Sequence, residues 1–357
     1  MFNLHSLPLP VLGAPMAGGV STPELAAAVS SAGGLGFLAA GYKSADAVRE
    51  QILRTRSLTG AGFGVNLFVP DHANTYAANT CAAAEADRKL AAALAFRDRL
   101  AAGTGLEPGH PNPDDDDGWP AKLDLVLQEQ PAVVSFTFGL PDAAVLAELA
   151  GRDICTVITV TDPDEARAAA GAGARVLCVQ GPGAGGHRGT LDSAKAPGDV
   201  PLDELLRGIA EVSDLPLVAA GGIAAPSDAA AALACGATAV QVGTLLLLSP
   251  EAGTSPVHRL ALREAALGSR WQETSLTRAF SGRPARGLTN EFMRTYPDAP
   301  DAYPYINQIT GPLRAAAAAE GNPDGVSLWA GTGYRQVSGD AAGIIVRRLA
   351  GVGDREY

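Results

Sequence analysis

One histidine lies in an unusually glycine-rich stretch of the chain. The stretch runs from Gly181 to Gly189 as Gly-Pro-Gly-Ala-Gly-Gly-His-Arg-Gly, with five glycines around His187. Glycine lets the backbone approach a ligand closely and present N–H groups to an anion. An imidazole held over that ligand can act as a base or, when protonated, as an anchor for an anion. A flexible hinge with a bystander histidine is the alternative, but an apolar run ends directly before this stretch and favours a catalytic role.

Two further glycine-containing segments also follow short apolar runs. Gly221-Gly222 ends one run, and Gln241-Val242-Gly243-Thr244 ends the next. Backbone N–H groups and the Thr244 hydroxyl can hold a phosphate without a lysine. Tight packing of a helix on a strand would also use glycines. Two such segments on neighbouring strands favour a phosphate site.

Small residues and amides complete a candidate site for a flat ring. Ala14, Pro15 and Met16 follow the first apolar run, and they can lie beneath an aromatic cofactor. The side chains of Asn66 and Gln180 can each donate and accept a hydrogen bond, as an isoalloxazine or purine edge requires. Asn66 alone could equally cap a turn. A phosphate site and a flat ring together predict a bound mononucleotide, most simply FMN.

Several other kinds of site lack their motifs. The five histidines never pair at i, i+3 or i+4, and the four cysteines show no CxxC spacing, so we expect no metal site. No Gly-x-Ser-x-Gly hydrolase motif and no phosphate-binding Gly-x4-Gly-Lys-Ser/Thr loop is present. The absence of Gly-x-Gly-x-x-Gly after the first strand argues against a Rossmann NAD domain.

A recurring unit must position these residues: a capped, alanine-rich helix, a glycine turn and a short apolar strand. Thr22-Pro23 and Asp162-Pro163 mark two of the helix starts, the second with a capping-box spacing to Glu165. Repeated βα units indicate a parallel sheet. Eight apolar runs are expected as strands: 11–16, 35–40, 63–68, 133–138, 154–160, 175–181, 217–222 and 239–244.

Eight such units within about 250 residues favour a closed barrel over an open sheet. The expected fold class is α/β, a (β/α)8 TIM barrel with an additional smaller, mostly helical cap. The barrel would occupy 1–250 with a long insertion at about 70–130, the cap 251–325, and a segment packing back on the barrel 326–357. In such a barrel the active site lies at the carboxyl ends of the strands, where the residues above are found.

The insertion and the cap carry features of their own. A helix is expected at about 79–102 and a closing helix at about 340–349. The run Asp114–Asp117 reads as a solvated loop, with a cation site as the alternative. In the cap, four residues can either shape a substrate pocket or serve in packing: Tyr296, Tyr303, Tyr305 and Arg314.

Composition excludes some partners. Among the 357 residues, 27 are Lys or Arg and 38 are Asp or Glu, for a net charge of −11, which disfavours nucleic-acid binding. We expect no membrane span and no signal peptide. Unpaired cysteines within apolar runs suit a reducing compartment, so a cytoplasmic location is expected. A homodimer is left open.

The motifs together resemble the nitronate monooxygenases, formerly called 2-nitropropane dioxygenases. The resemblance covers about residues 8–335. It rests on Ala14–Gly19, Gly64–Phe68, Gln180–Gly189, Gly221–Ile223 and Gln241–Thr244, with Asn322–Gly325 and Leu328–Gly331. It implies an FMN-bound TIM barrel that oxidises alkyl nitronates such as propionate 3-nitronate with O2, giving the carbonyl compound and nitrite. His187 would be the catalytic residue. The implied flavin contacts are Ala14, Pro15, Met16, Asn66, Gln180, Gly185, Gly222, Gln241, Val242, Gly243 and Thr244.

Two departures from the family pattern put substrate choice in doubt. Pro182-Gly183 stands where many members carry a carboxylate, and the aspartate-rich loop is unusual. Two rival functions remain. One is an FMN-dependent NAD(P)H:quinone or enoyl-thioester reductase on the same barrel. The other is a non-catalytic mononucleotide-binding barrel, for which His187 would be dispensable.

Overall fold

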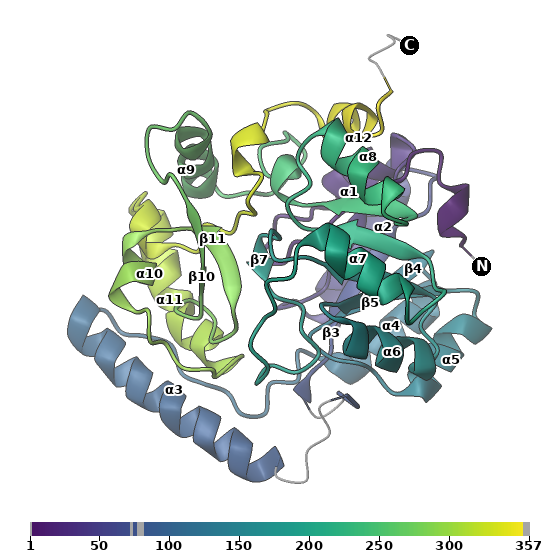
Figure 1. Ribbon diagram of the computed structural model, residues 1–357. Helices are drawn as coiled ribbons and strands as arrows, with labels where there is room; N and C mark the ends of the chain where they lie inside the picture. Colours follow the sequence, from purple (N-terminus) through teal and green to yellow (C-terminus); the bar gives the residue numbers. More distant parts are fainter. Residues whose placement is uncertain (1, 72–73, 77–81, 353–357) are drawn as a thin grey trace.

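Eight parallel strands form the barrel that the sequence predicts (Figure 1). The computed structural model describes residues 2–71, 74–76 and 82–352. The strand order is β1-β9-β8-β6-β5-β4-β3-β2, and β1 returns to the segment before β2 through Gly13 N–Leu35 O (3.0 Å) and Leu35 N–Val11 O (3.1 Å). This closes a TIM barrel. The barrel strands are β1 (Val11–Gly13), β2 (Phe37–Ala39), β3 (Gly64–Phe68), β4 (Val133–Thr137), β5 (Cys155–Val160), β6 (Val176–Gln180), β8 (Leu217–Ala220) and β9 (Ala239–Val242).

Helices surround the barrel between successive strands, and a last helix fills the remaining position. Two predicted caps are confirmed: Thr22 Oγ1 accepts from Leu25 N at 3.0 Å, and Asp162 Oδ1 accepts from Glu165 N at 2.9 Å. These helices are α1 (Pro23–Ser31), α2 (Ala45–Leu58), α4 (Trp119–Glu129), α5 (Ala143–Gly151), α6 (Pro163–Ala172), α7 (Leu202–Ala210), α8 (Pro226–Ala234) and α12 (Ala342–Leu349). The closing helix expected at about 340–349 is α12, which contacts α1, α8 and β1.

The capping box expected at α6 does not form. The Glu165 carboxylate reaches one residue beyond the N-cap Asp162, so that Oε2 accepts from Thr161 N (2.6 Å) and Oε1 from Leu191 N (2.7 Å). Glu165 is completely buried. Its carboxylate therefore joins the residue before its own helix to the loop that follows the glycine-rich stretch.

A second, smaller layer covers one side of the barrel mouth (Figure 1). It holds the short antiparallel strands β10 (Thr274–Thr277), β11 (Ala285–Leu288) and β7 (Gly186–His187), in that order. The expectation of a mostly helical cap did not include this sheet. Around it lie α9 (Pro256–Ala266), α10 (Glu291–Thr295), α11 (Tyr305–Ala319) and, from the insertion, α3 (Ala82–Thr104).

The insertion contributes to both layers. Phe96 and Leu100 of α3 share a buried cluster with Phe280 and Phe292 of the cap, whereas α4 packs on α2 and β3 of the barrel. We therefore propose a division of the chain in which α3 counts with the cap. His72, Cys81 and the first residues of the helix expected at 79–102 lie outside the described residues.

The aspartate-rich loop holds its carboxylates against protein donors. Asp116 Oδ1 accepts from Gly118 N (2.8 Å), Asp115 Oδ2 from Gln308 Nε2 (2.7 Å), and Asp117 Oδ1 from Tyr42 N (2.7 Å). Asp117 also pairs with Lys122 at 2.7 Å. The loop thus joins the barrel to α11. Over the described part of the chain, no helix is long and apolar enough to cross a membrane.

Candidate active site

All twelve residues predicted for the site line one cavity of about 640 Å³ at the carboxyl ends of the barrel strands. They come from the ends of five barrel strands (β1, β3, β6, β8 and β9), which the barrel topology brings together. A volume of this size lies within the range of small-molecule and cofactor sites. The residues are Ala14, Pro15, Met16, Asn66, Gln180, Gly185, His187, Gly222, Gln241, Val242, Gly243 and Thr244.

The barrel end of the cavity offers an oriented amide over small side chains. Asn66 Oδ1 accepts from Ser135 Oγ (2.8 Å) and Thr137 Oγ1 (3.0 Å), which leaves Nδ2 as the donor toward the cavity. Cys178 and Ala220 line the same end. A flat ring could lie here with a hydrogen-bond donor at its edge.

Gln180 braces the turn that carries His187. Its Nε2 donates to His187 O (3.1 Å), and its Oε1 accepts from Gly189 N (2.8 Å). On the other side, β7 pairs with β11 of the cap, His187 facing Ala285. The backbone of His187 is therefore held by both the barrel and the cap. Both ends of the Gln180 amide are occupied by this turn.

The imidazole of His187 lies among aromatic rings and next to one hydroxyl. The centroids of Phe138, Tyr303 and Trp329 lie 5.5, 6.0 and 5.6 Å from that of His187. His187 Nε2 lies 2.8 Å from Ser281 Oγ. Burial, with smaller contributions from nearby arginines, lowers the pKa of His187 to about 3. The imidazole is therefore neutral at pH 7.

A cradle of backbone N–H groups lies beside the ends of β8 and β9. In the described part of the chain, the N–H groups of Gly222, Gly243 and Thr244 donate no hydrogen bond to another residue. The Thr244 hydroxyl accepts from Gly331 N at 2.9 Å. The segment around Gly331 crosses close to Gly185, where an added Cβ would lie 2.4 Å from Gly331 N. The cradle offers donors to an anion without a lysine.

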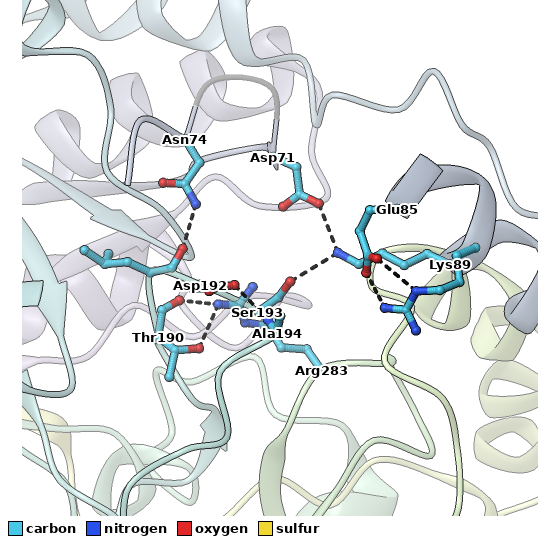
Figure 2. Close-up of polar contacts among 11 residues, drawn as sticks. Asp71, Asn74, Glu85, Lys89, Thr190, Asp192, Ser193, Ala194 and Arg283 are labelled. Atoms are coloured by element: carbon cyan, nitrogen blue, oxygen red, sulfur yellow. Dashed lines mark hydrogen bonds and ion pairs between the residues drawn. The ribbon is translucent and has the colours of Figure 1, made fainter. Parts of the chain in front are cut away.

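The loop after the glycine-rich stretch is tied to the cap and the insertion (Figure 2). Arg283 donates to Thr190 O and Oγ1, and Lys89 Nζ contacts Ser193 Oγ (3.2 Å) and Asp71 Oδ2 (3.3 Å). Asn74 Nδ2 donates to Leu191 O at 2.6 Å. These contacts hold the loop on its outer side.

Sequence reasoning missed two residues that contact His187, Trp329 and Ser281. Trp329 lay within the segment that carried the resemblance but was not assigned to the site, and Ser281 had no motif at all. Among the four cap residues considered, Arg314 lines the cavity and Tyr303 contacts His187, while Tyr296 and Tyr305 lie in the buried cluster of the cap.

His258 of α9 also lines the cavity, and its buried Nε2 has no hydrogen-bond partner. Burial lowers the pKa of His258 to about 4. For His187 and His258 the folded-state pKa lies below the usual value of 6.5. Below pH 6.5 the unfolded chain therefore binds protons that the folded chain does not. The contribution of these two neutral imidazoles to the free energy of unfolding is therefore complete above pH 6.5. It is lost as the pH falls toward 3–4.

We expect the free energy of unfolding to fall between pH 7 and pH 5 by about 1–2 kcal/mol for each of these imidazoles. Urea unfolding at the two pH values measures the change. His258→Gln removes one of the two titrating groups, so its pH dependence should be weaker than that of the wild type. An identical pH dependence in the variant would contradict the assignment.

A closed parallel barrel with a neutral imidazole and an N–H cradle at its mouth defines the class: a TIM-barrel enzyme with a ligand site at the strand ends.

The family model described as nitronate monooxygenase matches residues 2–349. The chain is 38% identical over 344 residues to a nitronate monooxygenase of Pseudomonas aeruginosa, with 93% of this chain and 92% of that protein covered.

Two solved structures extend the comparison. Nitroalkane oxidase from Streptomyces ansochromogenes is similar with a TM-score of 0.88 and 44% identity, covering 98% of this chain and 96% of that chain. FabK from Thermotoga maritima is similar with a TM-score of 0.72 and 26% identity, covering 97% and 93%. The chain belongs to the nitronate monooxygenase family, and it is a flavin-dependent oxidoreductase.

Proposed function

We propose that this protein binds FMN at the barrel mouth and oxidises alkyl nitronates, such as propionate 3-nitronate, with O2 to the carbonyl compound and nitrite. The observation that carries the proposal is the neutral, ring-enclosed His187 over a cavity that all twelve predicted residues line. The match to the nitronate monooxygenase family model supports the reaction class.

The residues present fit FMN. The unpaired N–H groups of Gly222, Gly243 and Thr244 would hold the phosphate, and Asn66 Nδ2 would donate to the flat ring. A side chain at position 243 would enter the space beside Met16, since an added Cβ would lie 3.3 Å from Met16 Sδ. Bound FMN would supply the electron acceptor for the nitronate and the site of reaction with O2.

His187 acts next to the substrate as a neutral imidazole. Its unprotonated ring nitrogen can take the α-proton of a neutral nitroalkane. The rings of Phe138, Tyr303 and Trp329 keep water away from this position. A nitronate has already lost its α-proton, so its oxidation depends on His187 only for the position of the substrate. Oxidation of a neutral nitroalkane also depends on His187 for proton transfer.

Ser281 fixes which ring nitrogen carries the proton. Its hydroxyl lies 3.2 Å from Arg283 O and donates there, so it accepts from His187 Nε2–H. The lone pair is then on Nδ1, because the tautomer follows from the hydrogen bond that the other nitrogen makes. Ser281 is a positioning residue, since its contact is with His187.

Ser281→Ala should retain FMN and lower kcat with a neutral nitroalkane by about 5- to 10-fold, the effect of one hydrogen bond of about 1 kcal/mol. Steady-state kinetics on protein of known flavin content measure it. Ser281→Thr restores the hydroxyl and should recover activity. Ser269→Ala is the control, because that exposed hydroxyl also donates to a backbone carbonyl, that of Glu264. Equal kcat in Ser281→Ala and the wild type would remove Ser281 from the mechanism.

The direct test of the function is an oxygen electrode with purified protein. The protein should be yellow, carry about one FMN per chain, and consume O2 with propionate 3-nitronate or propyl-2-nitronate. Rapid anaerobic bleaching of the flavin by NADH or NADPH, without nitronate turnover, would favour the reductase instead. A bound flavin with no turnover of any of these compounds would favour the non-catalytic barrel.

A further inference from the structure

The described residues that line the cavity carry one formal charge. Among the described residues that line it there is no Asp, Glu or Lys, and His187 and His258 are neutral at pH 7. Arg314 is the remaining ionisable base in the lining. A side chain that selects an anion by charge must be cationic, so the role that a protonated His187 was expected to fill has another candidate.

Arg314 is held in place by its own helix. Its Nη2 donates to Asn307 O (2.9 Å) and Asn307 Oδ1 (2.8 Å), both seven residues earlier on α11. Asn307 and Arg314 both line the cavity. The guanidinium is therefore pre-oriented by a neutral partner, without loss of its charge.

The charge of Arg314 is not neutralised by any residue that the structure describes. No carboxylate of the described residues lies within ion-pair distance of it, and its buried Nε donates no hydrogen bond. Lys122 shows the contrast, because that buried ammonium pairs with Asp117 at 2.7 Å. A buried unpaired cation is costly, and an anion that accepts from its free N–H groups recovers that cost.

The guanidinium also lies within electrostatic reach of His187. Its charge contributes to the lowered pKa of that imidazole, after burial and Arg283. Arg283 differs from Arg314 because its guanidinium donates to the backbone of Arg188 and Thr190 and lies 4.3 Å from the centroid of the Phe138 ring. Of the two arginines whose charges lower that pKa, Arg314 is the one that lines the cavity.

We propose that Arg314, oriented by Asn307, binds the anionic oxygens of the nitronate and makes the site selective for the anion over the neutral nitroalkane. A nitronate spreads its charge over two oxygens, which matches the planar fork of a guanidinium. This inference rests on the proposed function. It separates anion binding, at Arg314, from proton transfer, at His187.

The test compares propyl-2-nitronate with its neutral parent, 2-nitropropane, in the FMN-loaded protein. Arg314→Met should raise KM for the nitronate by about 30-fold or more, the scale for removing one partner of a buried charge pair. KM for 2-nitropropane should change less than about 3-fold, because a neutral ligand gains little from the charge. Arg314→Lys, which keeps the charge but loses the fork, should lie between. Arg207→Met on the outer face of the barrel, an exposed arginine paired with Asp203, is the matched control.

A second measurement does not need turnover. Nitrate is a planar oxyanion, and its binding can be followed by the absorbance of the bound flavin. Arg314→Met should weaken nitrate binding at least about 10-fold, while thermal unfolding should occur at or above the wild-type temperature, since an apolar side chain replaces an unpaired charge. If the wild type turns over no nitronate yet nitrate binding still depends on Arg314, the anion site stands and the proposed function fails.

Three results would overturn the proposal. Loss of FMN from Arg314→Met would assign the arginine to the cofactor. Equal weakening of propyl-2-nitronate and 2-nitropropane would make its role one of packing. If Arg314→Met leaves the nitronate KM or nitrate binding unchanged, Arg314 is not the anion anchor. The same follows if the wild type does not bind nitrate.

Discussion

Replacing His187 by asparagine or alanine should keep the flavin and lower turnover of a neutral nitroalkane by about 100-fold or more, the scale of a lost acid–base group. The backbone around residue 187 is held by Gln180 and by pairing with β11, and neither contact uses the imidazole. The cofactor site should therefore survive the substitution. Turnover is measured per bound flavin, so that any loss of FMN is separated from loss of catalysis.

The pH dependence of the wild type provides a second check on His187. With a pKa of about 3, the imidazole does not titrate between pH 5 and pH 8. A profile of kcat/KM for a nitronate should therefore show no step near pH 6.5 attributable to this residue. His110→Asn, an exposed loop histidine, is the control for general effects of losing an imidazole. Full activity in His187→Asn would refute the assigned role.

The barrel could be predicted from the sequence because each of its parts has a local signal. Apolar runs such as 154–160 are bounded by helix caps and glycine turns, and these signals are strong when strands are buried on both faces. The predicted runs were longer than the strands. The run at 11–16 is a strand only over Val11–Gly13, and the residues beyond it form the loop at the cavity.

The cap sheet had no such signal. β7 has two residues, and β10 and β11 have four each without an alternation of apolar and polar side chains. Strands of this length are defined by their pairing, which joins His187 to Ala285 almost a hundred residues away. Local pattern cannot reveal such pairing.

The site divides in the same way. Strand-end residues such as Asn66 and Thr244 could be predicted, because barrel topology alone collects them at one mouth. Ser281 could not, since its contact with His187 depends on how the cap folds over the barrel. The charge of His187 could not be predicted either, because it follows from burial and from arginines distant in sequence.

Substitution of Gly185 should have the second large effect. It tests whether this glycine serves flavin contact or close packing of the backbone. The resemblance assigned Gly185 to flavin contact, and in the structure it is also the point where the glycine-rich stretch meets the backbone of Ala330 and Gly331. A Cβ at residue 185 would lie 2.4 Å from Gly331 N and 2.6 Å from Ala330 C. Because both are backbone atoms, no side-chain rotation can relieve the overlap, and one segment must move.

Gly185→Ala should therefore displace Gly331 from the Thr244 hydroxyl and disturb the N–H cradle beside it. We expect the dissociation constant of FMN to rise at least about 10-fold, because overpacking commonly costs more than about 1 kcal/mol. Flavin fluorescence on dilution measures the dissociation constant. Gly60→Ala is the matched control, since an added Cβ there would contact nothing within 4 Å. Unchanged FMN affinity in Gly185→Ala would mean that the crossing of these two segments does not hold the cofactor site together.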